Sequence, residues 1–255
     1  MRFRILIPCV LAFSWASCIG GSMVWGDVIE PITFTMTPDA THNNQVALTL
    51  KITLFGLSES QTQSSLVTGS FNTNLDLAFD GSNQATVTGI GFVPKTAPGN
   101  LSFSDVSFFS GDVTSSGLKG DFSTSSPPTV VSGGAFSTLG GNLLVNGGIL
   151  NATSLGTTLN FGDSPESLPF GDNTASIVVS APSIVGNLAT YNVTLLLPAD
   201  VPMTAIPTTP ASVSASGTIR ATASFTETIP EPGTLVMLLG LAVGLAGCGW
   251  LRRRS

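Results

Sequence analysis

The sequence contains little charge, and most of its basic residues lie near its two ends. Asp, Glu, Lys and Arg make up 9% of the 255 residues, with 9 basic and 15 acidic side chains. Arg2, Arg4 and Arg252 to Arg254 account for five of the basic residues, so the segment 27–229 has four basic and fourteen acidic residues. Its net charge of about −10 at neutral pH repels phosphate groups, which argues against nucleic acid as a partner.

The same segment contains no cysteine, no tryptophan and a single histidine. The three cysteines are Cys9, Cys18 and Cys248, which all fall in apolar stretches near the ends. The absence of cysteine from 27–229 excludes disulfides, thiol nucleophiles and zinc–thiolate sites there. The one histidine, His42, stands beside two asparagines in a polar stretch, a setting typical of a solvated turn residue.

The first 26 residues have the layout of a secretory signal peptide. Arg2 and Arg4 form a short positive start, an apolar stretch follows over 5–19, and small residues follow from Gly20. Cleavage after Gly26 is the first expectation and cleavage after Ser22 the second, which makes Sec translocation and signal peptidase expected partners. An uncleaved N-terminal anchor and lipidation at Cys18 are the alternatives.

The last 26 residues combine three features in a fixed order. Pro230-Glu231-Pro232 comes first, an uncharged run over 233–251 follows, and Arg252, Arg253 and Arg254 precede the final serine. Nineteen helical residues rise about 28 Å, which matches the hydrocarbon core of a bilayer. The arginine cluster is costly to translocate and is expected to stop transfer on the cytoplasmic side. The two prolines favour an extended backbone, which a processing enzyme can bind.

This combination resembles the PEP-CTERM sorting signal. The resemblance implies that exosortase, a multi-pass membrane protease, recognises the tail near Pro230, Glu231 and Pro232. The rest of the chain would then be released or transferred to the outer surface, often in bacteria that build exopolysaccharide. The resemblance covers only residues 230–255 and carries no information about the segment before them.

Two other interpretations of the tail stay open. The apolar run could be a permanent anchor beside two incidental prolines. Gly240 and Gly244 also form a GxxxG pattern, which can pair membrane helices.

The middle of the chain alternates apolar and polar residues in short runs separated by Gly, Pro, Asn and Asp. This pattern predicts strands and turns, and the expected strands are 32–36, 46–55, 71–79, 84–92, 101–109, 176–180, 188–197 and 212–225. We expect an all-β, antiparallel domain of the β-sandwich or jelly-roll type over 27–229. A β-solenoid is disfavoured because no fixed repeat is present.

Two stretches of the middle predict few strands. Residues 111–148 are rich in glycine and serine and give the weakest strand pattern. Residues 198–210 contain Pro202, Pro207 and Pro210, and we expect a proline-rich loop there because proline cannot donate to a sheet ladder.

Gly-Asp pairs recur at Asp112, Asp121, Asp163 and Asp172. The favoured interpretation is that they supply hairpin turns, since both residue types tolerate unusual backbone angles. Ca²⁺ binding by loop carboxylates is a weaker alternative because no dense Asp-x-Asp loop is present. Glycoside hydrolysis needs two carboxylates, but sugar sites in such domains are usually lined by Trp or Tyr, and Tyr191 is the only one available.

These features predict an exported bacterial protein of the cell surface or extracellular matrix. Before processing, it would be held in the inner membrane by 233–251 with its C-terminus in the cytoplasm. The domain is expected to be adhesive or structural, without enzymatic activity, cofactor or resident metal, and its expected contacts are exopolysaccharide or further copies of itself. The alternative is a permanently anchored domain that binds or processes carbohydrate.

Overall fold

The computed structural model describes residues 25–80, 83–92, 100–124, 129–207 and 209–229. Across these residues the fold is all-β with antiparallel pairing, as predicted, and no α-helix occurs among them. The elements are β1 (Trp25–Met36), β2 (Gln45–Leu54), β3 (Leu57–Phe79), β4 (Ala85–Phe92), β5 (Asn100–Phe103), β6 (Ser107–Phe108), η1 (Phe109–Gly111), β7 (Val113–Thr124), β8 (Thr129–Val130), β9 (Ala135–Ser137), β10 (Gly141–Ala152), η2 (Thr153–Leu155), β11 (Thr157–Asn160), β12 (Glu166–Pro169), β13 (Thr174–Val179), β14 (Ser183–Val185), β15 (Leu188–Pro198), β16 (Val201–Ala205) and β17 (Ala211–Thr228).

Strands form where the sequence alternates, because successive side chains of a strand point to opposite faces. In β15, Tyr191, Val193 and Leu195 are buried, while the threonine and asparagine residues between them are more exposed. All eight expected strands correspond to strands of the structure, with 101–109 divided between β5 and β6. The alternation therefore identified which side of each strand is buried.

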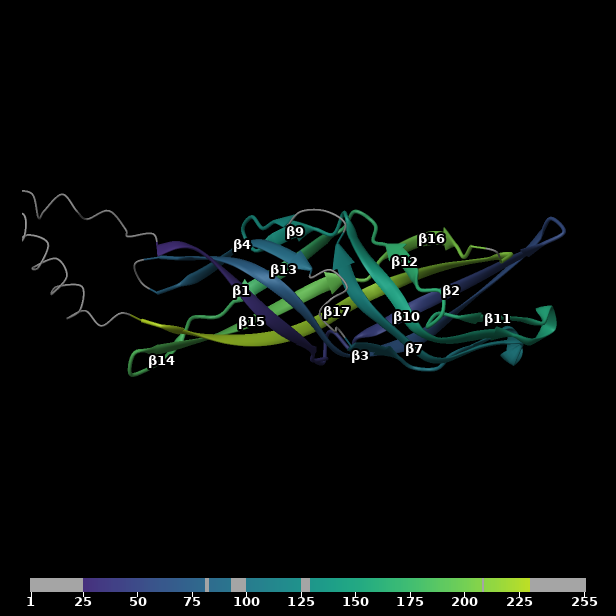
Figure 1. The fold of residues 1–255 in the computed structure, drawn as a ribbon, viewed down its shortest axis with the longest axis horizontal. Coiled ribbons are helices and arrows are strands. Elements are labelled where there is room, and N and C mark those ends of the chain that lie inside the picture. The colour runs from purple at the N-terminus through teal and green to yellow at the C-terminus, as the bar shows by residue number, and fades with distance from the viewer. Residues whose placement is uncertain (1–24, 81–82, 93–99, 125–128, 208, 230–255) are drawn as a thin grey trace, which may run out of the picture.

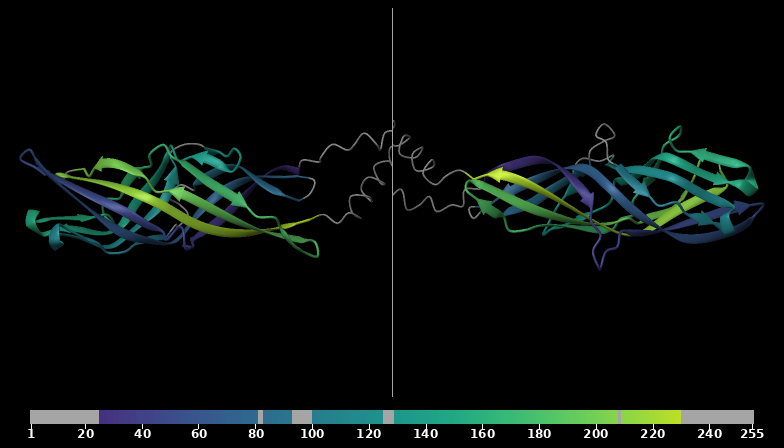
Figure 2. Two further views of the ribbon diagram at one scale, coloured as in Figure 1. Left: turned by 180° about the vertical axis from the view of Figure 1, so that it is seen from behind. Right: turned by 90° about the horizontal axis from the view of Figure 1, so that it is seen from below.

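Two long strands connect the halves of an elongated molecule. Residues 57–66 of β3 pair with β2, whereas residues 70–79 pair with β1. Residues 211–217 of β17 pair with β2, whereas residues 218–228 pair with β15. Figures 1 and 2 show β1 beginning and β17 ending at one end of the molecule, with the β2–β3 hairpin at the other. We call these the proximal and distal ends.

Gly69 marks the place where β3 changes partners. Its φ is 112°, and a Cβ built on it would lie 1.7 Å from the carbonyl oxygen of Asn100. Only glycine allows this backbone angle and this close approach of β5 together.

The strands of the proximal half close on themselves. Pairing runs from β13 through β15, β17, β1 and β3 to β4. β8 then pairs with β4, β9 pairs with β13, and a bridge between Ser132 and Ala135 closes the short turn that leads from β8 into β9. This closure surrounds a core rich in aromatic rings, in which Phe34 stacks on Phe71 with centroids 5.5 Å apart and Tyr191 stacks on Phe225 at 4.8 Å.

A polar clamp joins β17 to the β1–β2 connection near the middle of the molecule. Asn44 is fully buried, with its Nδ2 donating to the Arg220 carbonyl at 3.0 Å and its Oδ1 accepting from the Arg220 amide at 2.7 Å. The Arg220 guanidinium lies 2.9 Å from Asp39 through Nε and donates to the Thr37 carbonyl at 2.6 Å. The Asn44 side chain therefore bonds to the Arg220 backbone at the place where β17 stops pairing with β2 and begins to pair with β1.

The predicted loop over 198–210 is wrong in part, because Pro202 lies inside β16. Within the described ranges β16 pairs with β17 alone, and its register shifts between Val201 and Thr204. Proline is tolerated on an edge strand at such an irregularity because its missing N–H interrupts no ladder bond. The weakly patterned stretch 111–148 also contains strands, among them β7 and β10, which pair over most of their length.

Candidate functional site

The proximal end brings the first and last described residues together. A hollow of about 100 Å³ is lined by Val28 of β1, by Glu227 and Thr228 of β17, and by Phe79, Asn83, Tyr191 and Ile229. The Ile229 amide donates to the Asn187 carbonyl at 2.7 Å, so backbone pairing continues just beyond β17. The next residue, Pro230, has no amide hydrogen and cannot extend this pattern as a donor.

Two groups at this end, Glu227 and Tyr191, have raised pKa values. Burial raises the pKa of the Glu227 carboxyl, and the negative charge of Glu30 raises it further. Burial likewise raises the pKa of Tyr191, whose hydroxyl donates to the Asn83 carbonyl at 2.7 Å. The Tyr191 hydroxyl therefore takes part in a structural contact, and Tyr191 is too deeply buried to serve as a sugar platform.

The residues predicted to direct sorting lie outside the described part of the chain. They are Pro230, Glu231, Pro232, Arg252, Arg253 and Arg254, together with the predicted membrane helix 233–251. Of the predicted signal peptide 1–26, residues 1–24 also lie outside, whereas Trp25 and Gly26 belong to β1. Within the described ranges, none of the helical segments is long and apolar enough to span a membrane.

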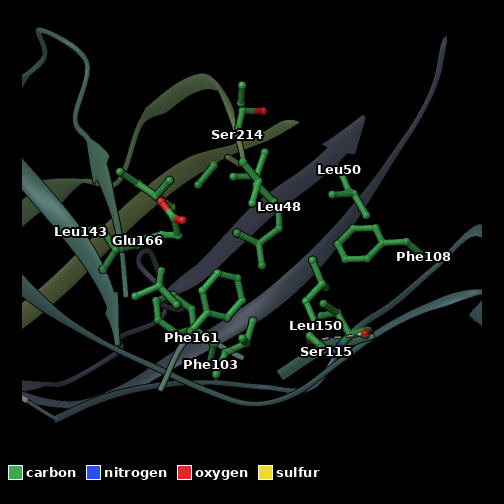
Figure 3. Close-up of a pocket in the computed structure, with 18 residues that line it drawn as sticks. Leu48, Leu50, Phe103, Phe108, Ser115, Leu143, Leu150, Phe161, Glu166 and Ser214 are labelled. Carbon is green, nitrogen blue, oxygen red and sulfur yellow. Dashed lines mark hydrogen bonds between the residues drawn. The ribbon is translucent and has the colours of Figure 1, made fainter. Parts of the chain in front are cut away.

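An apolar cavity of about 90 Å³ lies inside the distal half. Figure 3 shows side chains of β2, β5, β6 and β10 converging on it, among them Leu48, Phe103, Phe108 and Leu150. In the part of the chain that the structure describes, Glu166 is the one charged residue that lines it. The Ser115 hydroxyl accepts a hydrogen bond from the Val106 amide at 3.0 Å, so it serves the backbone. The cavity is suited to apolar contacts, and no histidine is found among the described residues that line it.

Three of the four Gly-Asp carboxylates lie in connections between strands, as the turn interpretation predicts. Asp112 follows η1 between β6 and β7. Asp163 accepts from Asn160 Nδ2 at 2.7 Å between β11 and β12, and Asp172 accepts from the Ser137 hydroxyl at 2.7 Å between β12 and β13. In the described residues, no three His, Cys, Asp or Glu side chains gather in a way that could hold a metal ion.

The turn interpretation is wrong for Asp121, which lies within β7. A Cβ at the preceding Gly120 would lie 2.9 Å from the Leu144 carbonyl oxygen, so this glycine permits close strand packing instead of a turn. Asn146 Nδ2 donates to Asp121 Oδ2, while the buried Oδ1 has no hydrogen-bond partner among the described residues. Burial raises the pKa of the Asp121 carboxyl, and the Asn146 hydrogen bond opposes the rise.

His42 belongs to the polar clamp. Its backbone amide donates to Asp39 Oδ1 at 2.7 Å, and its ring Nδ1 lies 3.3 Å from the same oxygen. The amides of His42 and Thr41, followed by the charge of Arg220, hold the pKa of the Asp39 carboxyl below its ordinary value. The structure therefore places His42 in a turn, beside one carboxylate that already has an arginine partner.

A second hollow, of about 310 Å³, lies at the distal end and was not predicted from the sequence. It is lined by Ile52, Leu54, Phe55, Leu57, Glu59, Phe109, Asp112, Val113 and Leu155, and we call it the distal hollow. Its one signal in the sequence was Phe55-Gly56 between two alternating runs, a spacing typical of a two-residue hairpin. No pattern linked this hairpin to the turns that complete the hollow.

Comparison with known proteins identifies the end of the chain. Residues 228–255 match the PEP-CTERM protein-sorting motif, as the resemblance of the tail predicted. The match begins at the last residue of β17 and includes the prolines, the apolar run and the arginines. No curated protein and no solved structure matches the chain. The motif implies export and processing by exosortase, a membrane protein.

Proposed function

We propose that this chain is a bacterial surface or matrix protein that exosortase sorts and processes through residues 228–255, and whose domain is adhesive or structural. The observation that carries the proposal is the sorting motif, which follows β17 without an intervening domain. Glu231 is the charged group available for recognition between the two prolines. The run 233–251 would hold the substrate in the inner membrane until cleavage, and Arg252 to Arg254 would keep its end in the cytoplasm.

The position of the chain ends supports this order of events. β1 begins and β17 ends at the proximal end (Figure 1), so a signal peptide and a sorting tail would both leave the domain on the same side. The β2–β3 hairpin would then point away from the membrane. We include in the proposal a signal peptide over 1–26 and a sandwich-like domain over 27–229, which the inward-facing apolar rows support.

The polar side chains that were weighed as catalytic candidates form hydrogen bonds within the fold, which supports a role without catalysis. Asp163 accepts a hydrogen bond from Asn160 of β11, Asp172 accepts one from Ser137 of β9, and His42 belongs to the polar clamp. Exopolysaccharide binding and self-association stay alternatives for the domain. Glycan pull-down would detect the first, and light scattering over a concentration series would detect the second.

The test of sorting is the C-terminus of the mature protein, mapped by mass spectrometry. The chain would be expressed in a bacterium that has exosortase, in the same strain without it, and as the variant Glu231→Ala. Glu227→Ala is the matched control, because this glutamate lies just before the motif. We expect loss of the tail only in cells with exosortase, for the unchanged chain and the control. A tail that persists in every sample would show a permanent anchor and refute the proposal.

A further inference from the structure

The distal end carries an aromatic side chain in an unusual position. Leu54 pairs with Leu57, which leaves Phe55 and Gly56 as a two-residue hairpin loop. Their φ angles are 52° and 82°, as in a type I′ turn, which ordinarily uses Asn or Gly at the first position. Phe55 is fully exposed, at 103% of its reference area, and Leu57 is 77% exposed. The hairpin therefore holds a phenyl ring in solvent at the cost of a strained backbone angle.

Phe55 lies at the edge of a site built from three separate connections. The β2–β3 hairpin meets the turn after β6, represented by Phe109 and Asp112, and the turn after β10, represented by Leu155. Figures 1 and 2 show the hairpin and the β10–β11 connection both reaching this end of the molecule. The volume of about 310 Å³ is at the lower end of the range for ligand sites and suffices for a large apolar side chain.

The charges around the hollow all have one sign. Glu59 and Asp112 are exposed, and neither forms a salt bridge within the described residues. Among the residues that the structure describes, none that lines the hollow is basic. Lys51 belongs to the opposite face of β2 by strand alternation, because Ile52 and Leu54 face the hollow. Two carboxylates beside an exposed aromatic ring attract a cation by charge and by cation–π contact.

We propose that the distal hollow docks a polypeptide segment of a partner protein that presents a large apolar side chain next to Lys or Arg. The apolar side chain would fill the floor formed by Ile52, Leu54 and Leu57, while the cation would lie between Phe55 and the two carboxylates. The inference names the adhesive surface and partner of the proposed surface protein, and it rests on that function for its biological setting.

The chemistry of the hollow disfavours other occupants. A sugar would bury hydroxyl groups against a floor that is largely aliphatic, and unpaired buried hydroxyls are costly. In a head-to-head dimer, Glu59 and Asp112 of one copy would face the same carboxylates of the second copy. An anionic membrane surface would be repelled in the same way.

The test measures binding of a fluorescent peptide with the core Lys-Phe-Lys to the purified full-length chain in mild detergent. Glu-Phe-Glu and Lys-Ala-Lys peptides are the matched probes, and fluorescence anisotropy at low ionic strength is the measurement. We expect Lys-Phe-Lys to bind at least tenfold more tightly than either probe, and we expect added salt to weaken it.

Two double variants, each of which removes two negative charges, test where the peptide binds. Glu59→Gln with Asp112→Asn should weaken Lys-Phe-Lys binding about fivefold to tenfold. Glu30→Gln with Glu227→Gln makes the same change at the proximal end and should leave binding unaltered. Phe55→Asn should weaken binding at least fivefold while retaining the hairpin, because Asn-Gly suits a type I′ turn.

Three results would overturn the inference. If the distal and the proximal double variants weakened Lys-Phe-Lys binding equally, the peptide would be attracted by the overall negative charge of the protein and not by the distal hollow. Binding of chitosan oligosaccharides that is lost in Phe55→Asn would make the hollow a glycan site, and Phe55-dependent dimers in light scattering would make it a contact between copies. Because the peptide assay needs no sorting, failed binding leaves the processing result intact, and failed processing leaves binding measurable.

Discussion

The polar clamp makes a quantitative prediction for Asn44→Ala. The side chain of Asn44 forms two hydrogen bonds with the Arg220 backbone, at 2.7 and 3.0 Å, in a fully buried setting. Loss of the bond to the Arg220 amide leaves that group unpaired and costs about 1.5 to 2 kcal/mol. The Arg220 carbonyl keeps the Thr37 amide as a donor at 3.1 Å, so loss of the other bond costs about 0.5 to 1 kcal/mol. Asn44 also has φ of 56°, and placing Ala in that region costs about 1 kcal/mol. Together these effects predict a loss of about 3 to 4 kcal/mol in the free energy of unfolding.

Asn44→Gly separates the two contributions. Glycine adopts positive φ freely, so this variant loses the hydrogen bonds alone and should cost about 2 to 3 kcal/mol. The exposed neighbour Asn43 is a control of the same residue type, since its side chain accepts only the Gln45 amide, at 3.1 Å. Asn43→Ala should cost no more than about 1 kcal/mol.

The assay is urea unfolding of the purified chain, followed by far-ultraviolet circular dichroism. In thermal unfolding of a domain of this size, the loss of free energy of unfolding expected for Asn44→Ala corresponds to a fall in Tm of about 6 to 16 °C. The reasoning would be refuted by equal costs for Asn44→Ala and Asn43→Ala. A cost below about 1 kcal/mol for Asn44→Gly would show that water replaces the side chain at the Arg220 backbone.

Two further predictions concern groups inside the domain. Burial raises the pKa of Asp121 in the folded chain, so the folded chain binds this proton more tightly than the unfolded chain does. The free energy of unfolding therefore falls as the pH rises from the unfolded-state pKa of Asp121 through its folded-state pKa. Asp121→Asn should therefore raise the free energy of unfolding by about 0.5 to 1 kcal/mol at neutral pH, as measured by urea unfolding. An equal gain at acid pH, where the carboxyl is already neutral, would show that burial of the charge is not the cause. Val145→Ile adds a methylene toward the internal cavity and should stabilise the domain by about 0.5 kcal/mol in the same assay, whereas a loss would show that the cavity cannot accept the added group.

The sequence alone predicted the features that depend on neighbouring residues. A sorting tail acts as a linear segment, so its prolines, apolar run and arginines are readable without a fold, and residues 228–255 match such a motif. Strand alternation is also local, since a residue such as Val193 turns inward by its place in the pleat. Both the end of the chain and the all-β class were therefore predictable.

Tertiary structure decided which strands pair and which turns meet. Periodicity shows which face of a strand is buried and carries no information about its neighbour. Asn44 and Arg220 are 176 residues apart, and the edge position that tolerates Pro202 depends on how β17 exchanges partners. The distal hollow arises in the same way, because Phe55, Asp112 and Leu155 approach only when β2, β7 and β10 lie in one packed half. Long-range packing, which local patterns do not encode, created the surface that we propose for partner binding.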